Sequence, residues 1–180
     1  MSMQFANVWE RVADTVGDEI ALINGDKKSS WSSFDSKAAK IATILEEHGL
    51  KSDSKVGIYL HNSNEYLEAQ YGVFKIEGVP INVNYRYKEN ELIYLLDNAD
   101  AEAVFFQGCY ADRIKAIKDQ LPKIKVYIQV DDGTEPLMQG AIDFENSISG
   151  AKEQKRFNRT EENIYMLYTG GTTGMPKGVM

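Results

Sequence analysis

A short run of glycine, threonine and lysine residues near Met180 has the chemistry of a phosphate-binding loop. It reads Thr-Gly-Gly-Thr-Thr-Gly, and a lysine follows after Met-Pro. The glycines let a ligand approach the backbone closely, the threonine hydroxyls can donate to phosphate oxygens, and the lysine adds a full positive charge. Consecutive backbone N–H groups in such a turn form a cradle for anions. The sequence therefore predicts a nucleotide-phosphate site made of Thr169, Gly170, Gly171, Thr172, Thr173, Gly174 and Lys177.

Two other common phosphate loops do not fit this run. A Walker A loop ends in Gly-Lys-Ser/Thr and opens a helix, whereas here Pro176 precedes Lys177, and Gly178-Val179 favours a strand. The dinucleotide fingerprint Gly-x-Gly-x-x-Gly is missing because the glycines are spaced differently. A plain hairpin turn rich in glycine and threonine is the structural alternative. A turn alone, however, requires neither three threonines nor a lysine.

Strands and helices alternate in the part of the chain that leads to this loop. Apolar runs predict strands, and helices with one apolar face lie between them. Such alternation predicts βαβ units and an α/β fold with a largely parallel sheet, whose ligands bind at the carboxyl ends of the strands. The predicted strands are Lys55–Leu60, Val79–Val83, Ala103–Phe106, Lys125–Val130 and Ile164–Tyr168.

The amino-terminal region predicts a helix, a hairpin and a second helix. Helical spacing places Phe5, Val8, Trp9, Val12 and Val16 on one buried face, and Gly17 ends that helix. The hairpin extends from residue 20 to 31 and turns at residues 24–26. We expect Ser32 or Ser33 to cap the next helix.

Two later segments have weaker patterns. Residues 138–147 predict a weak helix or a loop, and residues 150–159 are polar and charged, as in a surface linker.

Composition excludes several classes of function. The 180 residues carry a net charge of −7 with scattered basic residues, which argues against nucleic-acid binding. The hydrophobic content of 43% is enough to form the core of one domain. Residues 1–15 contain neither a signal peptide nor a membrane span, so we expect a cytoplasmic protein without a transmembrane segment.

The cysteine and the two histidines do not predict a metal site. Cys109 is the single cysteine, which excludes an internal disulfide and a cysteine-based zinc site and fits a reducing compartment; we expect it to be buried and inert. His48 fits the end of a helix, where the dipole favours it. His61 follows a strand, where ligands bind, although a solvated loop residue explains it more simply. Neither histidine has a metal-ligating partner at suitable spacing.

The loop resembles the signature of the AMP-forming adenylating enzymes, which include acyl-CoA synthetases, luciferases and peptide-synthetase adenylation domains. Their pattern Tyr-Thr-Ser-Gly-Thr-Thr-Gly-x-Pro-Lys-Gly-Val matches Tyr168 to Val179, except that Gly170 replaces the usual serine and removes one hydroxyl. Three further stretches look like the amino-terminal region of this family: Trp31–Phe34, Lys75–Pro80 and Asn84–Phe106. The segment from Asn84 to Ala99 particularly resembles the fatty acyl-CoA synthetase branch.

The resemblance implies a two-step ligase reaction on a fatty acid or a related small-molecule carboxylic acid. The acid reacts with ATP to give an acyl-adenylate, and coenzyme A then takes the acyl group, with Mg²⁺ implied alongside ATP. Residues 1–180 would form the amino-terminal part of the AMP-binding large domain and end in the phosphate loop at 168–178. Family members carry the magnesium glutamate and a lysine-bearing C-terminal domain beyond this region. No catalytic residue can therefore be named, and we expect the 180-residue chain alone to be inactive.

Two alternatives stay open at this point. A peptide-synthetase adenylation domain would share the loop, although Asn84 to Asp97 resembles acyl-CoA synthetases more closely. A non-catalytic module that binds a phosphate or a partner would form a stable, monodisperse protein. The particular acid, its chain length, the thiol acceptor and the oligomeric state are not encoded in any recognisable pattern.

Overall fold

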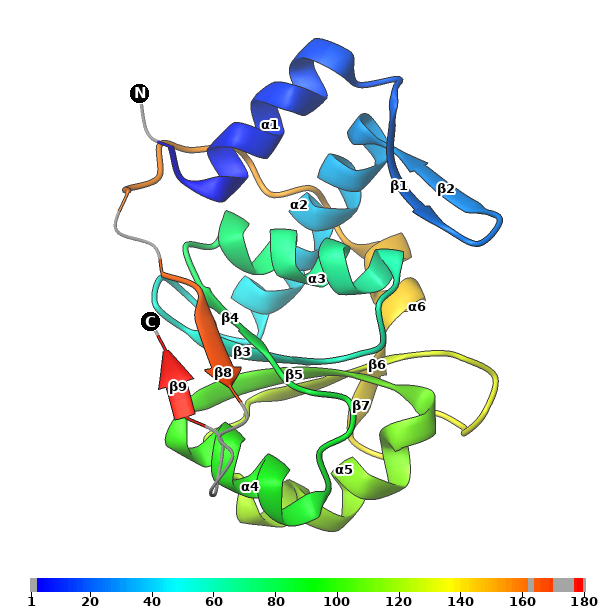
Figure 1. The fold of residues 1–180 in the computed structure, drawn as a ribbon. Helices are drawn as coiled ribbons and strands as arrows, with labels where there is room; N and C mark the ends of the chain where they lie inside the picture. The colour runs from blue at the N-terminus through cyan, green and yellow to red at the C-terminus, as the bar shows by residue number, and fades with distance from the viewer. Residues whose placement is uncertain (1–2, 162–163, 170–176, 180) are drawn as a thin grey trace.

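The computed structural model describes residues 3–161, 164–169 and 177–179 (Figure 1). Helices and strands alternate through the central part of the chain, as the sequence predicts. The helices are α1 (Phe5–Val16), α2 (Trp31–Glu47), α3 (Asn64–Lys75), α4 (Glu89–Asn98), α5 (Ala111–Ile117) and α6 (Phe144–Gly150). The strands are β1 (Ile20–Asn24), β2 (Lys27–Ser30), β3 (Lys55–Tyr59), β4 (Val79–Asn82), β5 (Ala101–Gln107), β6 (Val126–Val130), β7 (Ala141–Asp143), β8 (Met166–Thr169) and β9 (Lys177–Val179).

A sheet of seven described strands, in the order β7-β6-β5-β3-β4-β8-β9, forms the centre of the fold. All its neighbouring pairs are parallel except β8 and β9, which are antiparallel. The prediction of an α/β fold with a largely parallel sheet is confirmed. Since the strands from β3 to β8 run the same way, their carboxyl ends meet at one edge, where open α/β sheets bind ligands.

Helices cover both faces of the sheet (Figure 1). Helices α4 and α5 lie on one face and contribute residues such as Leu92, Leu95 and Ile114 to a core cluster that includes Ile81 and Phe106. Helices α2, α3 and α6 lie on the other face and bury a second apolar cluster. This two-sided cover explains why the strands read as continuous apolar runs.

A third cluster joins α1 to α2 and α3 through Ala6, Phe34, Ala38, Tyr71 and Phe74. Helix α1 has the predicted bounds, but its buried face differs from the predicted one. The buried residues of α1 are Ala6, Glu10 and Ala13, while Phe5 and Val16 are 50% and 40% exposed. The face that contains Glu10 turns inward because Glu10 pairs with the buried cations Lys75 and Arg159.

One local prediction is wrong, and a second is right only in part, because helix α6 fits the expected weak helix whereas strand β7 was not expected. Ser30, rather than Ser32 or Ser33, is the N-cap of α2, because its side chain accepts a hydrogen bond from the Ser33 N–H. The region predicted as a weak helix or loop contains β7 and α6. Strand β7 is short and only partly buried, so it has no apolar run of its own, and pairing with β6 defines it.

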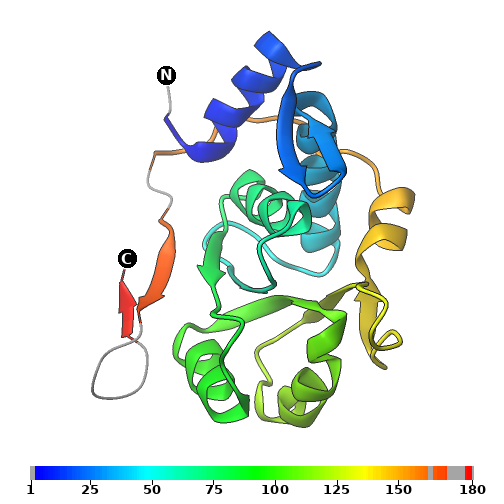
Figure 2. The same ribbon diagram turned by 45° about the vertical axis from the view of Figure 1, so that its right-hand side comes forward.

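The segment after α6 crosses the molecule from one edge of the sheet towards the other. It runs past α2 and α1 to β8, as Figures 1 and 2 show. The Gln154 N–H donates to the Ala39 carbonyl, and Arg156 pairs with Asp14 and Asp35. The predicted surface linker is therefore correct for most of its residues but wrong for Arg159, which is 3% exposed.

Candidate functional site

The β8–β9 hairpin holds the two ends of the predicted phosphate loop. Thr169 is the last residue of β8 and Lys177 the first of β9, and the antiparallel register places them opposite each other. Gly170, Gly171, Thr172, Thr173 and Gly174 lie outside the described residues. Thr169 and Lys177, the described ends of the predicted loop, are therefore paired neighbours at the carboxyl end of β8.

Strand β8 is fixed to the sheet by backbone pairing and by one polar side chain. It pairs in parallel with β4, with Met166 opposite Ile81 and Leu167 opposite Asn82. The Tyr168 hydroxyl donates to Asn98 Oδ1 at the end of α4, at 2.8 Å. Alternation along the strand buries Met166 and leaves Leu167 40% exposed.

Glycine at position 178 allows the hairpin to close over Tyr168. A β-carbon on Gly178 would lie 3.1 Å from the Tyr168 ring. That separation is shorter than ordinary van der Waals contact, so a larger residue would require the Tyr168 ring to shift by a few tenths of an ångström. The glycine after the lysine in the loop pattern therefore has a packing reason in addition to any role in binding.

A second polar group lies at the carboxyl ends of β3 and β5. His61 follows β3; its Nε2 is 2.7 Å from the Tyr110 hydroxyl, and its ring centroid is 4.9 Å from that of Tyr85. Arg113 donates to the Tyr59 hydroxyl and to the Tyr87 carbonyl. His61 is exposed, as predicted for a loop histidine, but it also has a defined hydrogen-bond partner.

The phenols of this group are hydrogen-bonding residues rather than bases. Burial raises the pKa of Tyr110 to about 12, and nearby Cys109 and Tyr59 add to this effect. Burial also raises the pKa of Tyr59, although the hydrogen bond from Arg113 opposes it. Both hydroxyls therefore stay protonated near neutral pH.

The surroundings of Cys109 and His48 indicate structural rather than catalytic residues. Cys109 is exposed, so the prediction of a buried thiol is wrong. Partial burial, followed by the Asp132 carboxylate, raises the pKa of Cys109, which disfavours the thiolate. His48 is the C-cap of α2, and its Nδ1 lies 2.8 Å from the Ile44 carbonyl, as predicted for a helix-terminal histidine.

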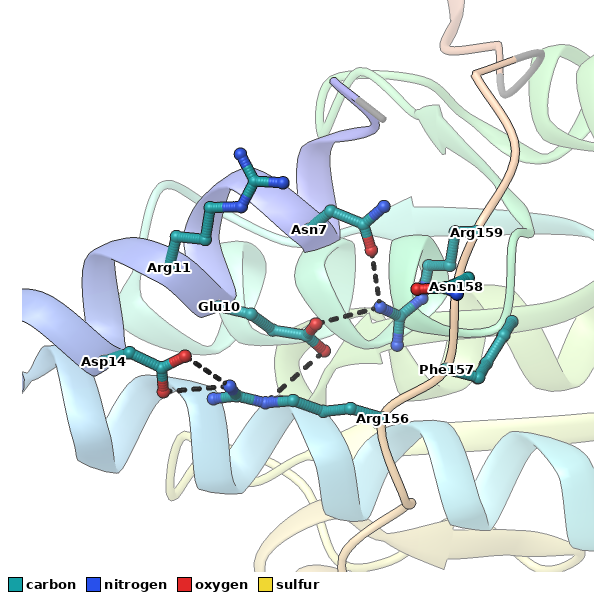
Figure 3. Close-up of a pocket in the computed structure, with 8 residues that line it drawn as sticks. All are labelled: Asn7, Glu10, Arg11, Asp14, Arg156, Phe157, Asn158 and Arg159. Carbon is teal, nitrogen blue, oxygen red and sulfur yellow. Dashed lines mark hydrogen bonds and ion pairs between the residues drawn. The ribbon is translucent and has the colours of Figure 1, made fainter. Parts of the chain in front are cut away.

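Sequence reasoning missed a buried ionic network on the opposite side of α3. Lys75 Nζ lies 2.7 Å from Glu10 Oε1 and 2.8 Å from Asp35 Oδ1, and Arg159 Nη1 lies 3.0 Å from Glu10 Oε2. A cleft of about 560 Å³ adjoins it, between α1 and residues 156–159 (Figure 3). No sequence signal marked these residues, because each is a single charge in a polar or amphipathic stretch.

No metal site is evident among the residues that the structure describes. They contain no group of three or more histidine, cysteine, aspartate or glutamate side chains placed to hold an ion. Over the same residues, no helix is both long and apolar enough to cross a membrane.

The described residues form an α/β domain in which the β8–β9 pair flanks the predicted phosphate loop. Residues 9–180 match the family described as AMP-binding enzyme. The chain therefore belongs to the AMP-binding enzyme family.

Similar proteins support this assignment. The chain is 38% identical to the 3-oxocholest-4-en-26-oate–CoA ligase of Rhodococcus rhodochrous and 36% identical to a medium/long-chain-fatty-acid–CoA/3-oxocholest-4-en-26-oate–CoA ligase of Mycobacterium tuberculosis. Each match covers 100% of this chain but 33% of the relative. The crystal structure of the anthranilate CoA ligase AuaEII with anthranoyl-AMP has the same fold, with a TM-score of 0.89 at 22% identity over 97% of this chain and 33% of that one. The chain thus spans about a third of the length of these relatives.

Proposed function

We propose that residues 1–180 form the amino-terminal part of the large domain of an ATP-dependent acyl-CoA ligase, ending in the phosphate loop at 168–178. The observation that carries the proposal is the loop pattern from Tyr168 to Val179 in a chain of the AMP-binding enzyme family. The antiparallel β8–β9 pair supports it, because this pair brings Thr169 and Lys177 together at the end of a parallel strand.

The loop would act on the phosphates of ATP. In the first step the acid's carboxylate oxygen attacks the α-phosphorus, and pyrophosphate leaves. Thr169, Gly170, Gly171, Thr172, Thr173, Gly174 and Lys177 would donate hydrogen bonds and positive charge to the phosphate oxygens. Donors that are already oriented stabilise charge as it moves onto the leaving group, and losing one typically slows a reaction by about 10²–10³-fold.

The second step would use coenzyme A. Its thiol sulfur attacks the acyl carbon of the adenylate, AMP leaves, and the thiol proton is released. The reaction needs no base for the first step, because the attacking carboxylate is already ionised. We assign no role in thioester formation to residues of the phosphate loop.

The substrate would be a large apolar carboxylic acid. The names of the two sequence relatives above describe CoA ligases for fatty acids and for a steroid acid. Their names favour a CoA ligase over the adenylation-domain alternative. The same relatives make a purely non-catalytic module the weaker interpretation of this chain.

Magnesium would accompany ATP, as the family implies. The described part of the chain supplies no cluster of carboxylates or histidines for it. We therefore derive no step from the metal.

The proposal can be tested by separating the two half-reactions in the full-length protein. The double variant Lys177→Ala/Thr173→Ala should slow ATP–pyrophosphate exchange by at least about 10²-fold, because each of the two substitutions removes a donor to phosphate. Thioester formation from a supplied acyl-adenylate should stay near the wild-type rate. Lys115→Ala, which removes an exposed lysine on α5, is the charge-matched control. Equal loss in both half-reactions would refute the assigned role of the loop.

A further inference from the structure

Arg159 is a buried cation in an otherwise exposed segment, and three hydrogen bonds hold it. Its Nε donates to the Lys75 carbonyl at 2.8 Å. Its Nη1 donates to Asn7 Oδ1 at 2.9 Å and to Glu10 Oε2 at 3.0 Å (Figure 3). The side chain has no measurable exposure. These partners compensate for part of the hydration that the buried guanidinium loses, while its Nη2 is buried without a hydrogen-bond partner among the described residues.

The contact with Lys75 caps the carboxyl end of α3. The last carbonyls of a helix lack partners within it. Here the Gly78 N–H donates to the Val73 carbonyl, and Gln4 Nε2 donates to the Phe74 carbonyl. Arg159 donates to the carbonyl of Lys75, the last residue of α3. A cation at this end also interacts favourably with the helix dipole. Arg159 therefore ties the crossing segment to the end of α3.

The next residue adds a second tie at the same place. The Thr160 N–H donates to Glu77 Oε1 at 2.6 Å, and the Thr160 hydroxyl lies 3.2 Å from the same oxygen. Glu77 has a φ of 56° in the tight turn between α3 and β4. Arg159 and Thr160 are thus both attached to the end of α3 and the turn after it, close to Val79, where β4 begins.

Strand β4 is the parallel neighbour of β8, and their ladder is short. It pairs Ile81 with Met166 and Asn82 with Leu167. A slip by one residue would shift the strand by about 3.3 Å and exchange the buried Met166 for the exposed Leu167. The fixed point at Arg159 limits how much chain is available to reach β4.

We propose that Arg159 is a positioning residue that sets the register of β8 on β4, and with it the placement of Thr169 and Lys177 at the ends of the phosphate loop. The anchor at Arg159 and Thr160 and the β4–β8 pairs are described contacts, and residues 162–163 between them lie outside the described part of the chain. The consequence for ATP rests on the proposed function.

Hydrogen exchange tests the register. In Arg159→Met, the backbone amides of residues 164–169 should exchange about tenfold faster or more, as expected when charged hydrogen bonds are lost. Arg159→Lys should not restore protection, because an ammonium cannot satisfy the three acceptors with the geometry of a guanidinium. Ile148→Ala, which opens the core under α6, controls for general destabilisation. Unchanged exchange in Arg159→Met, or a rise equal to that in Ile148→Ala, would overturn the proposal.

The half-reactions test the consequence for the loop. In the full-length protein, Arg159→Met should raise the KM for ATP in adenylate formation several-fold. The rate of thioester formation from a supplied acyl-adenylate should fall by a smaller factor. Faster exchange at β8 with normal use of ATP would refute the link to the loop. If the wild-type protein forms no acyl-adenylate with any acid, the proposed function fails, and the exchange experiment alone decides the role of Arg159.

Discussion

The buried network around Lys75 gives a sharp prediction for stability. The Lys75 side chain is 1% exposed, and its ammonium contacts Glu10 and Asp35 and lies 4.7 Å from the centre of the Tyr71 ring. Lys75→Met keeps most of the side-chain volume and removes the charge. It leaves the buried Glu10 and the partly buried Asp35 with one cation fewer, so we expect a marked loss of stability.

The magnitude follows from the contacts that remain. Removing one partner of a buried ion pair costs about 3–5 kcal/mol. Glu10 keeps Arg159 at 3.0 Å, and Asp35 keeps Arg156 at 2.7 Å, so the loss should fall at the lower end, about 3 kcal/mol. For a domain of this size, that corresponds to a fall in Tm of roughly 6–12 °C.

Urea unfolding followed by tryptophan fluorescence is the assay. Trp9 is a suitable probe, because its ring lies edge-on to Tyr71 with centroids 4.9 Å apart. Lys27→Met is the control: Lys27 also pairs with a glutamate, at 3.4 Å, but its side chain is 74% exposed. Exposed pairs contribute about 0–1 kcal/mol. A loss below about 1 kcal/mol for Lys75→Met, or one equal to that of the control, would refute the reasoning.

The same variant should change acid unfolding. Burial alone would raise the pKa of Asp35, but the hydrogen bonds from Lys75 and Tyr71 outweigh it and lower that pKa below 3.8. A carboxyl with a lowered folded-state pKa stabilises the fold above its ordinary pKa, and this stabilisation disappears as pH falls through the folded-state value. Without Lys75 the pKa rises, so acid unfolding should begin at a higher pH than in the wild type.

Three further predictions concern packing, pH and activity. Gly72→Ala should cost about 1–3 kcal/mol in urea unfolding, because its β-carbon would lie 2.4 Å from an Ile41 methyl on α2; Gly150→Ala, with open space around it, should be near neutral. Burial raises the pKa of Glu68 to about 7, against the opposing charge of Lys37. The native state then holds a proton that the unfolded state has lost, so stability falls between about pH 4.5 and 7; this fall should be absent in Glu68→Gln when unfolding is measured at pH 5 and 8. Finally, the 180-residue chain alone should show no ATP–pyrophosphate exchange with fatty or steroid acids, and robust exchange would contradict our expectation that it is inactive by itself.

Local patterns predicted most helices and strands of this chain. The bounds of α1 and the hairpin at β1–β2 agree with the structure, and the apolar runs at β3 to β6 are strands. These predictions succeed because a helix or a doubly covered strand shows its periodicity or apolar run within a few residues. Strand β7 escaped prediction because its identity comes from pairing with β6 rather than from its own side chains.

The candidate site also has a part that the sequence predicted and a part that only the fold revealed. The composition of residues 169–177 pointed directly to phosphate chemistry, since glycine, threonine and lysine carry their function in their own side chains and backbone freedom. The contact of Tyr168 with Asn98 could not be predicted, because the two residues are seventy positions apart. Neither could the burial of Glu10, which belongs to a helix whose predicted buried face did not include it.

By itself, therefore, the sequence determined the α/β class and most of its elements, since each depends on neighbours along the chain, and it predicted phosphate binding for the loop. The tertiary structure decided the order of the strands, the place of β8 beside β4 and the burial of Lys75 and Arg159. Charged side chains can be buried only where distant partners compensate for their lost hydration. Those partners, Glu10 on α1 and the end of α3, come together with Arg159 only in the folded chain.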